Sequence, residues 1–330
     1  MRNFVAIIAI ASIVGIATAR HGFSAQAAGS DQPANSTIDR LSDIAARPLQ
    51  RVLPPPPPPP VLPPVNEAGS VFEGVLSAEG VIAVDHVTDA VLFEKNAHAA
   101  RPLASITKLM SLLIIAERIP DWSATTTISA DVVEEGNQTV GAGEVYSMED
   151  LYDAAIVGSY NTAVSALAQA TGMTQEEFVR EMNRRARDFD MEGMSFVEPT
   201  GLSPDNIGTP ADVARLMKIA LSHPRVKVSS MLEKATITEL KTKKKKVVHA
   251  TDWLLTNTVV MKGAHIEGGK TGYIPEAGYN FAGQIKSDEG REIRVVVLGA
   301  KDVYSRFTET ASIAEWIFGS FKWVEAKEKY

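Results

Sequence analysis

The sequence predicts a mixed α/β (α+β) fold, in which an antiparallel sheet flanked by helices carries an inserted all-helical subdomain. Strand-like segments occur near both ends of the folded part, and helical patterns fill the middle. The first and last strands are therefore expected to meet in one sheet, because a strand must bury its apolar face against other elements. With 330 residues, 45% of them hydrophobic, the chain can form one large domain or two small ones, and it shows no internal repeat.

The first predicted elements are a hairpin and a helix. The segments GVIAVD at 80–85 and AVLFEK at 90–95 flank the turn HVTD. Apolar residues at helical spacing predict an amphipathic helix that begins near Ser105; these residues are Leu109, Leu112, Leu113 and Ala116. A strand-like TTTIS and a helix whose capping pattern starts at Ser147 come next.

Three helices, four strands and a last helix complete the prediction. The three helices cover 161–171, 175–189 and 210–222. The strands are ATITEL, VVHATD, YNFAGQIK and EIRVVVLGA, and the last helix covers 305–321. The run Lys241–Lys246 separates the first two of these strands, and we interpret it as a solvated hairpin tip that blocks edge pairing. Contact of this run with an anionic wall polymer or a lipid headgroup is a second interpretation.

Residues 1–27 have the three parts of a signal peptide. A positively charged start precedes the uncharged apolar run at 4–19, and small-x-small sites follow at Ala17–Ala19 and Ala25–Ala27. The run is shorter than the ~20 residues that a membrane span needs. We therefore expect cleavage, with an uncleaved anchor that tethers the chain to the membrane as the alternative. Both interpretations place the rest of the chain outside the cytoplasm, in the periplasm or cell wall.

A proline-rich linker is predicted at 28–70, ahead of a folded domain at 71–330. Nine of the eighteen prolines lie between Pro54 and Pro64. Such a tract forms a stiff polyproline II spacer that extends about 3.1 Å per residue. The spacer would let a domain that is held near the membrane work at a distance in the wall.

Composition excludes several classes of function. The formal net charge of −7 argues against nucleic acid as the main partner. The chain has no cysteine, which excludes disulfides, thiolate catalysis and cysteine-zinc sites. Its six histidines are scattered without metal-ligand spacing. We therefore expect neither a metal nor a cofactor.

Three short motifs occur once each and in a fixed order. Ser105 and Lys108 form S-x-x-K at the predicted helix start, where residues three apart share a face. Ser159 and Asn161 form S-x-N, and Lys270 begins K-T-G ahead of a predicted strand. Each motif alone is weak, and a capping serine with a solvated lysine would explain the first. The serines are 54 residues apart and Lys270 follows 111 residues later; this order and spacing together make a strong signal, although each motif alone does not.

The chain resembles the low-molecular-mass penicillin-binding proteins, the serine D-alanyl-D-alanine carboxypeptidase and endopeptidase family. The similar segments extend over nearly all of the folded part; they are LASITKLM, FVEPTGLSPDNIGTPADVARL, LLTNTVV, GGKTGYIPEAGYNFAG and RVVVLGA. The resemblance implies a β-lactamase/DD-peptidase-like fold, peptidoglycan stem peptides as substrates and β-lactam antibiotics as covalent inhibitors. The FVEPTGLS wording, and an end soon after the last predicted helix, look closest to the D-alanyl-D-alanine endopeptidase branch, also called penicillin-binding protein seven.

Acyl transfer requires an activated nucleophile. A serine hydroxyl is a poor nucleophile until a base removes its proton, and Lys108 is the candidate base for Ser105. Lys108 must be uncharged to act; burial favours that state, as does a nearby cation, for which Lys270 is the candidate. Ser159 would bridge the two lysines and pass a proton to the departing amine. Asn161 would orient Lys108 and hold a substrate amide.

The K-T-G segment is predicted to bind the substrate. Lys270 and Thr271 would grip a carboxylate, while Gly272 lets the substrate lie along the strand as an added edge. The resemblance implies that the backbone N–H groups of Ser105 and Tyr273 form the oxyanion hole.

Two departures from the family and three alternative functions remain open. Tyr160 stands in S-x-N where Gly, Ala or Asp is commoner, and Ile274 stands where threonine usually follows K-T-G-[YF]; both could reshape the cleft.

A β-lactamase would need an added base for deacylation, and Glu198 lies at about the right place. The E-x-x-x-N pattern is absent, however, so we interpret Glu198 as structural. A wall-binding module with a relic site is a second alternative, and the choice between carboxypeptidase and endopeptidase stays open.

Overall fold

The computed structural model describes residues 61–133 and 140–323. The predicted signal peptide or anchor at 1–27 and most of the linker at 28–70 lie outside the described residues. The packed part begins before the expected boundary at Val71, because Val65 pairs with Lys322 and Ser70 accepts a hydrogen bond from Trp316. No helix in the described ranges is long and apolar enough to cross a membrane.

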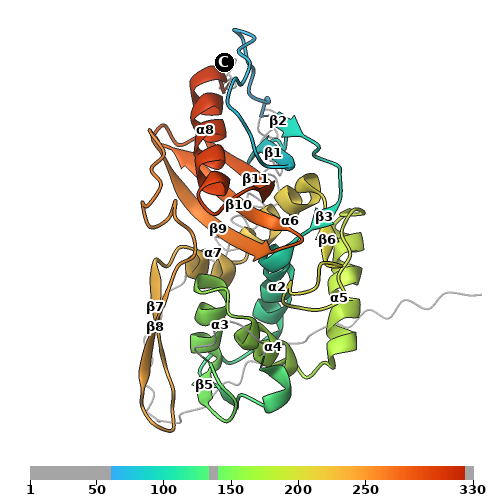
Figure 1. Cartoon of the computed structure of the whole chain (residues 1–330), viewed down its shortest axis with the longest axis vertical. Coiled ribbons are helices and arrows are strands. Elements are labelled where there is room, and N and C mark those ends of the chain that lie inside the picture. The colour runs from blue at the N-terminus through green and yellow to red at the C-terminus, as the bar shows by residue number, and fades with distance from the viewer. Residues whose placement is uncertain (1–60, 134–139, 324–330) are drawn as a thin grey trace, which may run out of the picture. The chain divides into compact units, whose positions relative to one another are not determined.

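A five-stranded sheet forms one half of the folded part (Figure 1). Its order is β2-β1-β11-β10-β9, and every neighbouring pair is antiparallel. The strands are β1 Gly80–Asp85, β2 Val91–Lys95, β9 Ala264–Ile274, β10 Gly278–Ser287 and β11 Glu292–Ala300. Because β1 pairs with β11, strands from both ends of the chain are neighbours, and the predicted closure of the sheet is confirmed.

Alternate residues of the central strands face different helices. In β11, Val295 belongs to an apolar cluster with α8 (Ser305–Ser320), whereas Val296 belongs to the cluster that contains α2 (Lys108–Arg118) and α6 (Pro210–Ser222). Successive side chains of a strand point to opposite faces. Both faces of the sheet are therefore covered, which explains why the RVVVLGA segment has a continuous apolar run.

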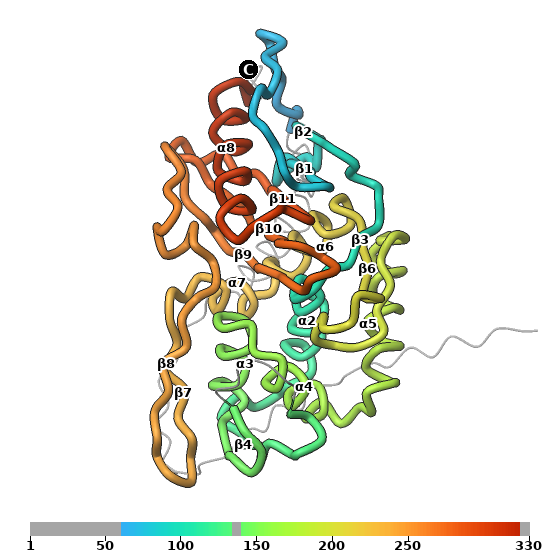
Figure 2. Tube along the Cα trace, viewed as in Figure 1, coloured from blue at the N-terminus to red at the C-terminus, as the bar shows by residue number. Residues whose placement is uncertain are grey.

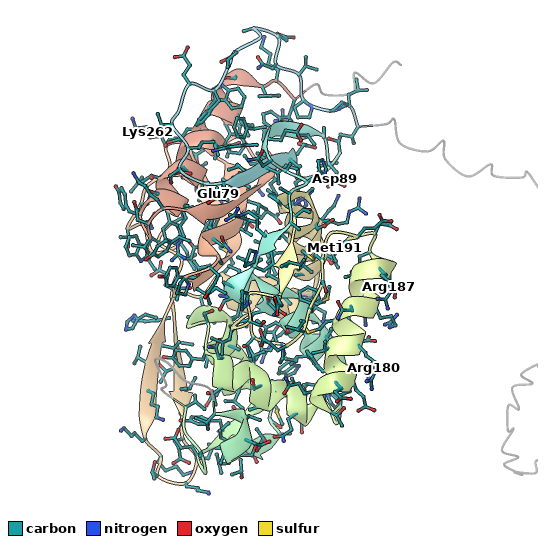
Figure 3. The ribbon with its side chains drawn as sticks, turned by 45° about the vertical axis from the view of Figure 1, so that its right-hand side comes forward. Glu79, Asp89, Arg180, Arg187, Met191 and Lys262 are labelled. Atoms are coloured by element: carbon teal, nitrogen blue, oxygen red, sulfur yellow. The ribbon has the colours of Figure 1, made fainter. Side chains whose placement is uncertain are left out.

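The inserted helical subdomain lies beyond α2, on the side of the molecule away from α8 (Figure 2). Its helices include α3 Met148–Val157, α4 Asn161–Ala170, α5 Gln175–Asp188 and α7 Pro224–Ser230. Ser147 accepts a hydrogen bond from the backbone N–H of Asp150, as its capping pattern predicts, and Thr174 caps α5 with a full capping box. On α5, Phe178 is buried while Arg180 and Arg187 project outward (Figure 3).

A long two-stranded ribbon runs along the edge of the helical subdomain (Figure 1). It consists of β7 Lys234–Thr238 and β8 Lys245–His249, so the run Lys241–Lys246 is at a hairpin tip, as predicted. Lys246 donates to Glu144 at 2.7 Å, and the other lysines of the run are exposed. Contact of the exposed lysines with an anionic polymer or headgroup remains a prediction.

The helix begins near Ser105, as predicted, but its first turn is the 3₁₀ turn η1 (Ala104–Thr107), which continues into α2 at Lys108. K-T-G is followed by the predicted strand, β10, but it lies itself inside β9, a strand that was not predicted. Pairing with β10 holds this glycine-rich segment extended although glycine weakens isolated strands. The short elements β3 Arg101–Pro102, η2 Ala130–Val132, β5 Val145–Ser147, β6 Ile207–Gly208 and the helix α7 were not predicted, and TTTIS contains β4 Thr125–Thr127.

Candidate active site

Two glycines contact the turn that carries Ser105. Ala104 precedes the serine with a left-handed φ of +49°. A Cβ on Gly201 would lie 1.9 Å from Ala104 O, and a Cβ on Gly272 would lie 3.1 Å from Ser105 N. Glycine alone allows backbones to approach this closely. The glycines of T-G-L and K-T-G therefore hold the nucleophile turn between two other segments of the chain.

Lys108 is fully buried, and the contacts of its amine include three oxygen atoms. Nζ lies 2.8 Å from Ser105 Oγ, 2.6 Å from Asn161 Oδ1 and 2.5 Å from Thr200 O. The amide and carbonyl oxygens can only accept hydrogen bonds. An uncharged amine has two N–H groups for these two acceptors, and its lone pair is then left for the hydroxyl proton of Ser105. This geometry suits Lys108 to act as a general base.

Ser159 and Lys270 form a second serine–lysine pair. Lys270 Nζ donates to Ser159 Oγ at 2.7 Å and to Thr271 O at 2.9 Å. Ser159 has a left-handed φ of +59° and lies between α3 and α4. Strained backbone of this kind persists where the surrounding structure holds it, often at functional sites. The predicted contact of Ser159 with Lys270 is thus present.

Both pairs face one cleft of about 530 Å³. Six of the eight predicted site residues line it: Ser105, Ser159, Asn161, Thr271, Gly272 and Tyr273. The other two, Lys108 and Lys270, are buried behind this lining and reach it through their serines. Thr271 Oγ1 lies 2.6 Å from Thr251 Oγ1, which also lines the cleft. The fold therefore brings all eight residues together.

Arg306 is a cleft residue that the sequence analysis missed. It lies in α8, and its Nη1 donates to Gly272 O at 3.2 Å. Its guanidinium also lies 5.6 Å from the ring of Tyr279, which stacks on the ring of Tyr273 at 4.3 Å. Burial lowers the pKa of Arg306 to about 10, so it remains a cation at neutral pH. No motif marks this arginine, because only the packing of α8 over the sheet brings it to the cleft.

The charge of Lys270 depends on several neighbours. Burial, then the charges of Lys108 and Arg306, lower the pKa of Lys270 well below its ordinary value. The carboxylate of Asp252 acts in the opposite direction. Lys270 was the predicted cation of the site, so the group that favours its charged form is relevant to the chemistry.

Glu198 holds the loop that follows it. Its carboxylate accepts hydrogen bonds from the backbone N–H groups of Thr200 and Gly201, each at 2.5 Å, and from Asn206 Nδ2 at 2.8 Å. Glu198 does not line the cleft in the part of the chain that the structure describes. These contacts confirm the interpretation of Glu198 as structural, since Thr200 in turn presents its carbonyl to Lys108.

The two departures from the family pattern both line the cleft. Ile274 is only 8% exposed and packs against Ala104 and Ala277. Tyr160 is half-buried, beside the loop of Ser159. Of the two, Tyr160 therefore offers more surface to a substrate.

A cleft serine paired with a buried lysine, on an antiparallel sheet with an inserted helical subdomain, defines the class as a serine hydrolase that lacks the usual histidine. The chain belongs to the D-alanyl-D-alanine carboxypeptidase family, peptidase family S11, whose profile matches residues 68–302. It is a serine DD-peptidase, as the resemblance implied.

The chain is similar both to D-alanyl-D-alanine endopeptidases and to D-alanyl-D-alanine carboxypeptidases. It is 27% identical to the D-alanyl-D-alanine endopeptidase of Pseudomonas aeruginosa, over 77% of this chain and 81% of that one. It is 26% identical to the endopeptidase of Escherichia coli K12, over 73% of this chain and 77% of that one. It is also 26% identical to the D-alanyl-D-alanine carboxypeptidase DacF of Bacillus subtilis, over 74% of this chain and 63% of that protein's length.

Solved structures support the fold. The Streptomyces K15 DD-transpeptidase superposes with a TM-score of 0.67 at 21% identity, over 76% of this chain and all of that one, which shows the β-lactamase/DD-peptidase-like fold. Penicillin-binding protein D2 from Listeria monocytogenes, in its ampicillin-bound form, superposes with a TM-score of 0.64 at 27% identity, over 74% of this chain and 98% of that one.

Proposed function

We propose that this chain is an exported endopeptidase that cleaves the D-alanyl bond of peptidoglycan cross-links through an acyl-enzyme on Ser105. The observation that carries the proposal is the position of Lys108 Nζ, 2.8 Å from Ser105 Oγ, with two acceptor oxygens around the same amine. The proposal includes a signal peptide or anchor at 1–27, a linker at 28–70 and a catalytic domain at 71–330. The enzyme then acts in the periplasm or cell wall.

Acylation uses both serine–lysine pairs. Ser105 Oγ attacks the carbonyl carbon of the D-alanyl residue, and Lys108 Nζ takes the hydroxyl proton. The N–H groups of Ser105 and Tyr273 stabilise the tetrahedral oxyanion. The C–N bond then breaks, the departing amine takes a proton from the hydroxyl of Ser159, which Lys270 orients, and Lys108 passes the proton that it took from Ser105 on to Ser159. Water hydrolyses the resulting ester and returns Ser105 to its starting state.

The sheet side of the cleft binds a carboxylate of the substrate. Thr271 and Arg306 line one wall of the cleft with a hydroxyl and a guanidinium, and the amine of Lys270 lies buried behind that wall. In a cross-link, the residue after the scissile bond carries a carboxylate beside the attacked amide, as a terminal D-alanine does. The same residues can therefore bind the carboxylate of cross-linked dimers and of pentapeptides. The preference for one substrate over the other then depends on the cleft beyond the leaving group, where Tyr160 lies.

The endopeptidases of Pseudomonas aeruginosa and Escherichia coli, which are 27% and 26% identical to the chain, support the endopeptidase activity. The family description supports the alternative, a carboxypeptidase that trims pentapeptides. β-Lactams are proposed as covalent inhibitors, by analogy with the ampicillin-bound relative.

Digestion of purified muropeptides separates these activities. We expect cross-linked dimers to be converted to monomers faster than pentapeptide monomers lose D-alanine, with Ser105→Ala inactive on both. If pentapeptides are trimmed while dimers survive, the carboxypeptidase alternative is correct. A labelled penicillin gives the second test: the wild type should stay labelled and Ser105→Ala should not be labelled at all. Rapid loss of the label would indicate a β-lactamase, and a wild type that never reacts would indicate a relic site.

A further inference from the structure

The tip of the β7–β8 ribbon carries three consecutive lysines, Lys243–Lys245, for which the mechanism above has no use. The other two lysines of the run are engaged: Lys246 donates to Glu144 at 2.7 Å, and Lys241 donates to the carbonyl of Gly143 at 2.7 Å. The three tip lysines are exposed, and no carboxylate in the described ranges pairs with their amines. Neighbouring like charges repel one another, so their presence without a partner is unfavourable to the fold.

A glutamate gives the turn that carries the tip lysines a defined shape. The backbone N–H of Glu239 donates to Lys244 O at 2.9 Å. Its carboxylate accepts from the backbone N–H groups of Lys241 at 3.1 Å and of Thr242 at 2.6 Å. Lys243 has a left-handed φ of +61° inside this turn. The one acidic side chain of the turn is therefore used to close it, and it does not neutralise the tip lysines.

Protection of a strand edge accounts for only part of this charge. Lysines prevent unwanted pairing where they lie along an edge strand. The β7–β8 ladder ends at the pair of Thr238 with Lys245, so Lys243 and Lys244 lie in the turn beyond the last paired residues. Two of the three tip lysines thus protect no strand, and a binding role remains for them.

The other end of the ribbon is part of the catalytic cleft. Thr251, which follows β8, lines the cleft, and its Oγ1 lies 2.6 Å from Thr271 Oγ1. The ribbon is held along the helical subdomain because Ile237 and Val248 are buried in the same apolar cluster as the residues of α3 (Figure 1). An extended chain advances about 3.3 Å per residue, so the segment 245–251 places the tip within roughly 20 Å of the cleft wall.

We propose that the tip lysines bind carboxylates of peptidoglycan stem peptides outside the cleft, so that the ribbon holds the polymer while one of its cross-links is cut. This inference rests on the proposed function, whose substrate is a mesh of stem peptides with free carboxylates. A single exposed ion pair is weak, but a polyanion engages several lysines at once. The formal net charge of the chain is −7, so the tip is a local exception on a protein that does not attract anions as a whole.

A lipid headgroup is the other anionic partner, and the ribbon suits it less well. Segments that bind a membrane surface combine basic residues with Trp, Phe or Leu side chains that enter the headgroup layer. The turn at 239–244 exposes no aromatic or large aliphatic side chain, and Val247 on β8 is the one large apolar residue exposed on this described ribbon. The tip therefore offers charge without an apolar anchor.

The test is cosedimentation of the full chain with purified peptidoglycan sacculi, treated with hydrofluoric acid to remove phosphate-linked polymers. Ser105→Ala is the parent protein, because it cannot digest the sacculi. The tip variant adds Lys243→Gln, Lys244→Gln and Lys245→Gln. Its Kd at low salt should be about 10-fold higher than that of the parent, since three weak ion pairs are lost together. The difference should disappear in about 1 M salt, where screening acts within about 3 Å.

Two control variants separate position from charge. The surface variant, with Arg187→Gln, Lys262→Gln and Lys301→Gln, removes three exposed positive charges elsewhere and should bind as the parent does; Arg187 lies on α5 and Lys262 precedes β9 (Figure 3). Arginine at all three tip positions keeps the charges and should preserve binding. Amidation of the sacculus carboxylates should weaken binding of the parent and leave the tip variant unchanged.

The outcomes also separate this inference from the proposed function. Equal affinity of the tip variant and the parent for sacculi overturns the inference, as does an equal loss in the surface variant. Binding to phosphatidylglycerol vesicles that needs the tip lysines, with sacculus binding unchanged, would make the tip a membrane contact instead. With Ser105 restored, the tip variant should cleave soluble dimers at the wild-type rate, because no tip lysine lines the cleft. A wild type that cleaves no muropeptide overturns the proposed function, whatever the sacculus binding shows.

Discussion

The helical side of the cleft and the sheet side each bury one lysine, but in different surroundings. The contacts of Lys108 include three uncharged acceptors, the oxygens of Ser105, Asn161 and Thr200. Lys270 faces a buried carboxylate, Asp252, in addition to its hydrogen bond with a serine. A carboxylate favours the ammonium form of a lysine more strongly than uncharged acceptors do. The contacts of Lys108 suit it to act as the base, and on the sheet side Asp252 opposes the burial and the two cations that lower the pKa of Lys270.

Lys108→Arg should have the largest effect, since it places a permanent cation where the base is needed. Arginine cannot lose its proton at usable pH, so acylation by penicillin should fall by at least ~10²-fold, as expected for lost general-base catalysis. The control Lys218→Arg changes a surface salt bridge with Asp89 and should leave the rate unchanged. Near-normal acylation by Lys108→Arg would show that Lys108 is not the general base.

Gly201→Ala tests how the helical side holds the nucleophile turn. Its φ is +86° and a new Cβ would collide with Ala104 O, whereas Gly172 has a similar φ of +80° with nothing within 4 Å. Gly172→Ala should cost about 1–2 kcal/mol, the strain of a left-handed residue. Gly201→Ala should cost more than ~3 kcal/mol and slow acylation, because the loop or the turn must move. Urea unfolding measures both, and equal losses would contradict the role of the close approach.

The free energy of unfolding of the wild type should depend on pH, through Asp252 on the sheet side, in a way that the free energy of unfolding of Asp252→Asn does not. The pKa of Asp252 is raised in the fold, from 3.8 to about 6, so its protonated form is the stabilised one. Relative to Asp252→Asn, the wild type should therefore be most stable below pH ~4 and lose about 3 kcal/mol as the pH rises to ~6, with little change above. Urea unfolding of both proteins across this window checks the difference. A constant difference would show that the carboxylate has an ordinary pKa.

Arg306→Gln tests the carboxylate grip on the sheet side. Hydrogen bonds to charged groups contribute about 1.5–3 kcal/mol, so kcat/KM for a carboxylate substrate should fall at least ~10-fold. The matched measurement uses the same peptide with that carboxylate converted to an amide. The wild type should lose a similar factor on the amide, while Arg306→Gln should no longer distinguish the two peptides. If Arg306→Gln still cleaves the carboxylate peptide faster than the amide peptide, then other residues bind the carboxylate.

Glu198→Gln should have the smallest effect and separates a loop role from a deacylating base. One N–H group of glutamine would face the backbone donors of the loop, so stability should fall by about 1–3 kcal/mol. Glu177→Gln, in the exposed capping box of α5, is the matched control and should cost less. The half-life of the penicilloyl label should be the same in wild type and Glu198→Gln. A longer half-life in the variant would make Glu198 a base.

Much of the molecule was predictable from local patterns. Continuous apolar runs predicted β1 and β11, and period-3.6 apolar spacing predicted α6, each with its observed bounds. The three motifs, in their order, also predicted seven residues that the structure brings to one cleft, and the family resemblance added Tyr273. Here the chemistry restricts the residue type at each position, so the sequence carries the signal directly.

The tertiary structure alone decided which residues support these eight. Arg306 and Asp252 have no local pattern, because their effect depends on distances to Lys270 that arise only when α8 and the loop after β8 pack against the sheet. The 3₁₀ form of the turn at Ser105 and the strand at K-T-G were not predicted for a related reason. Gly201 and Gly272, which lie far from Ser105 in the chain, contact the turn, and pairing with β10 holds K-T-G extended. Local propensity is worth fractions of a kcal/mol per residue, and such long-range contacts override it.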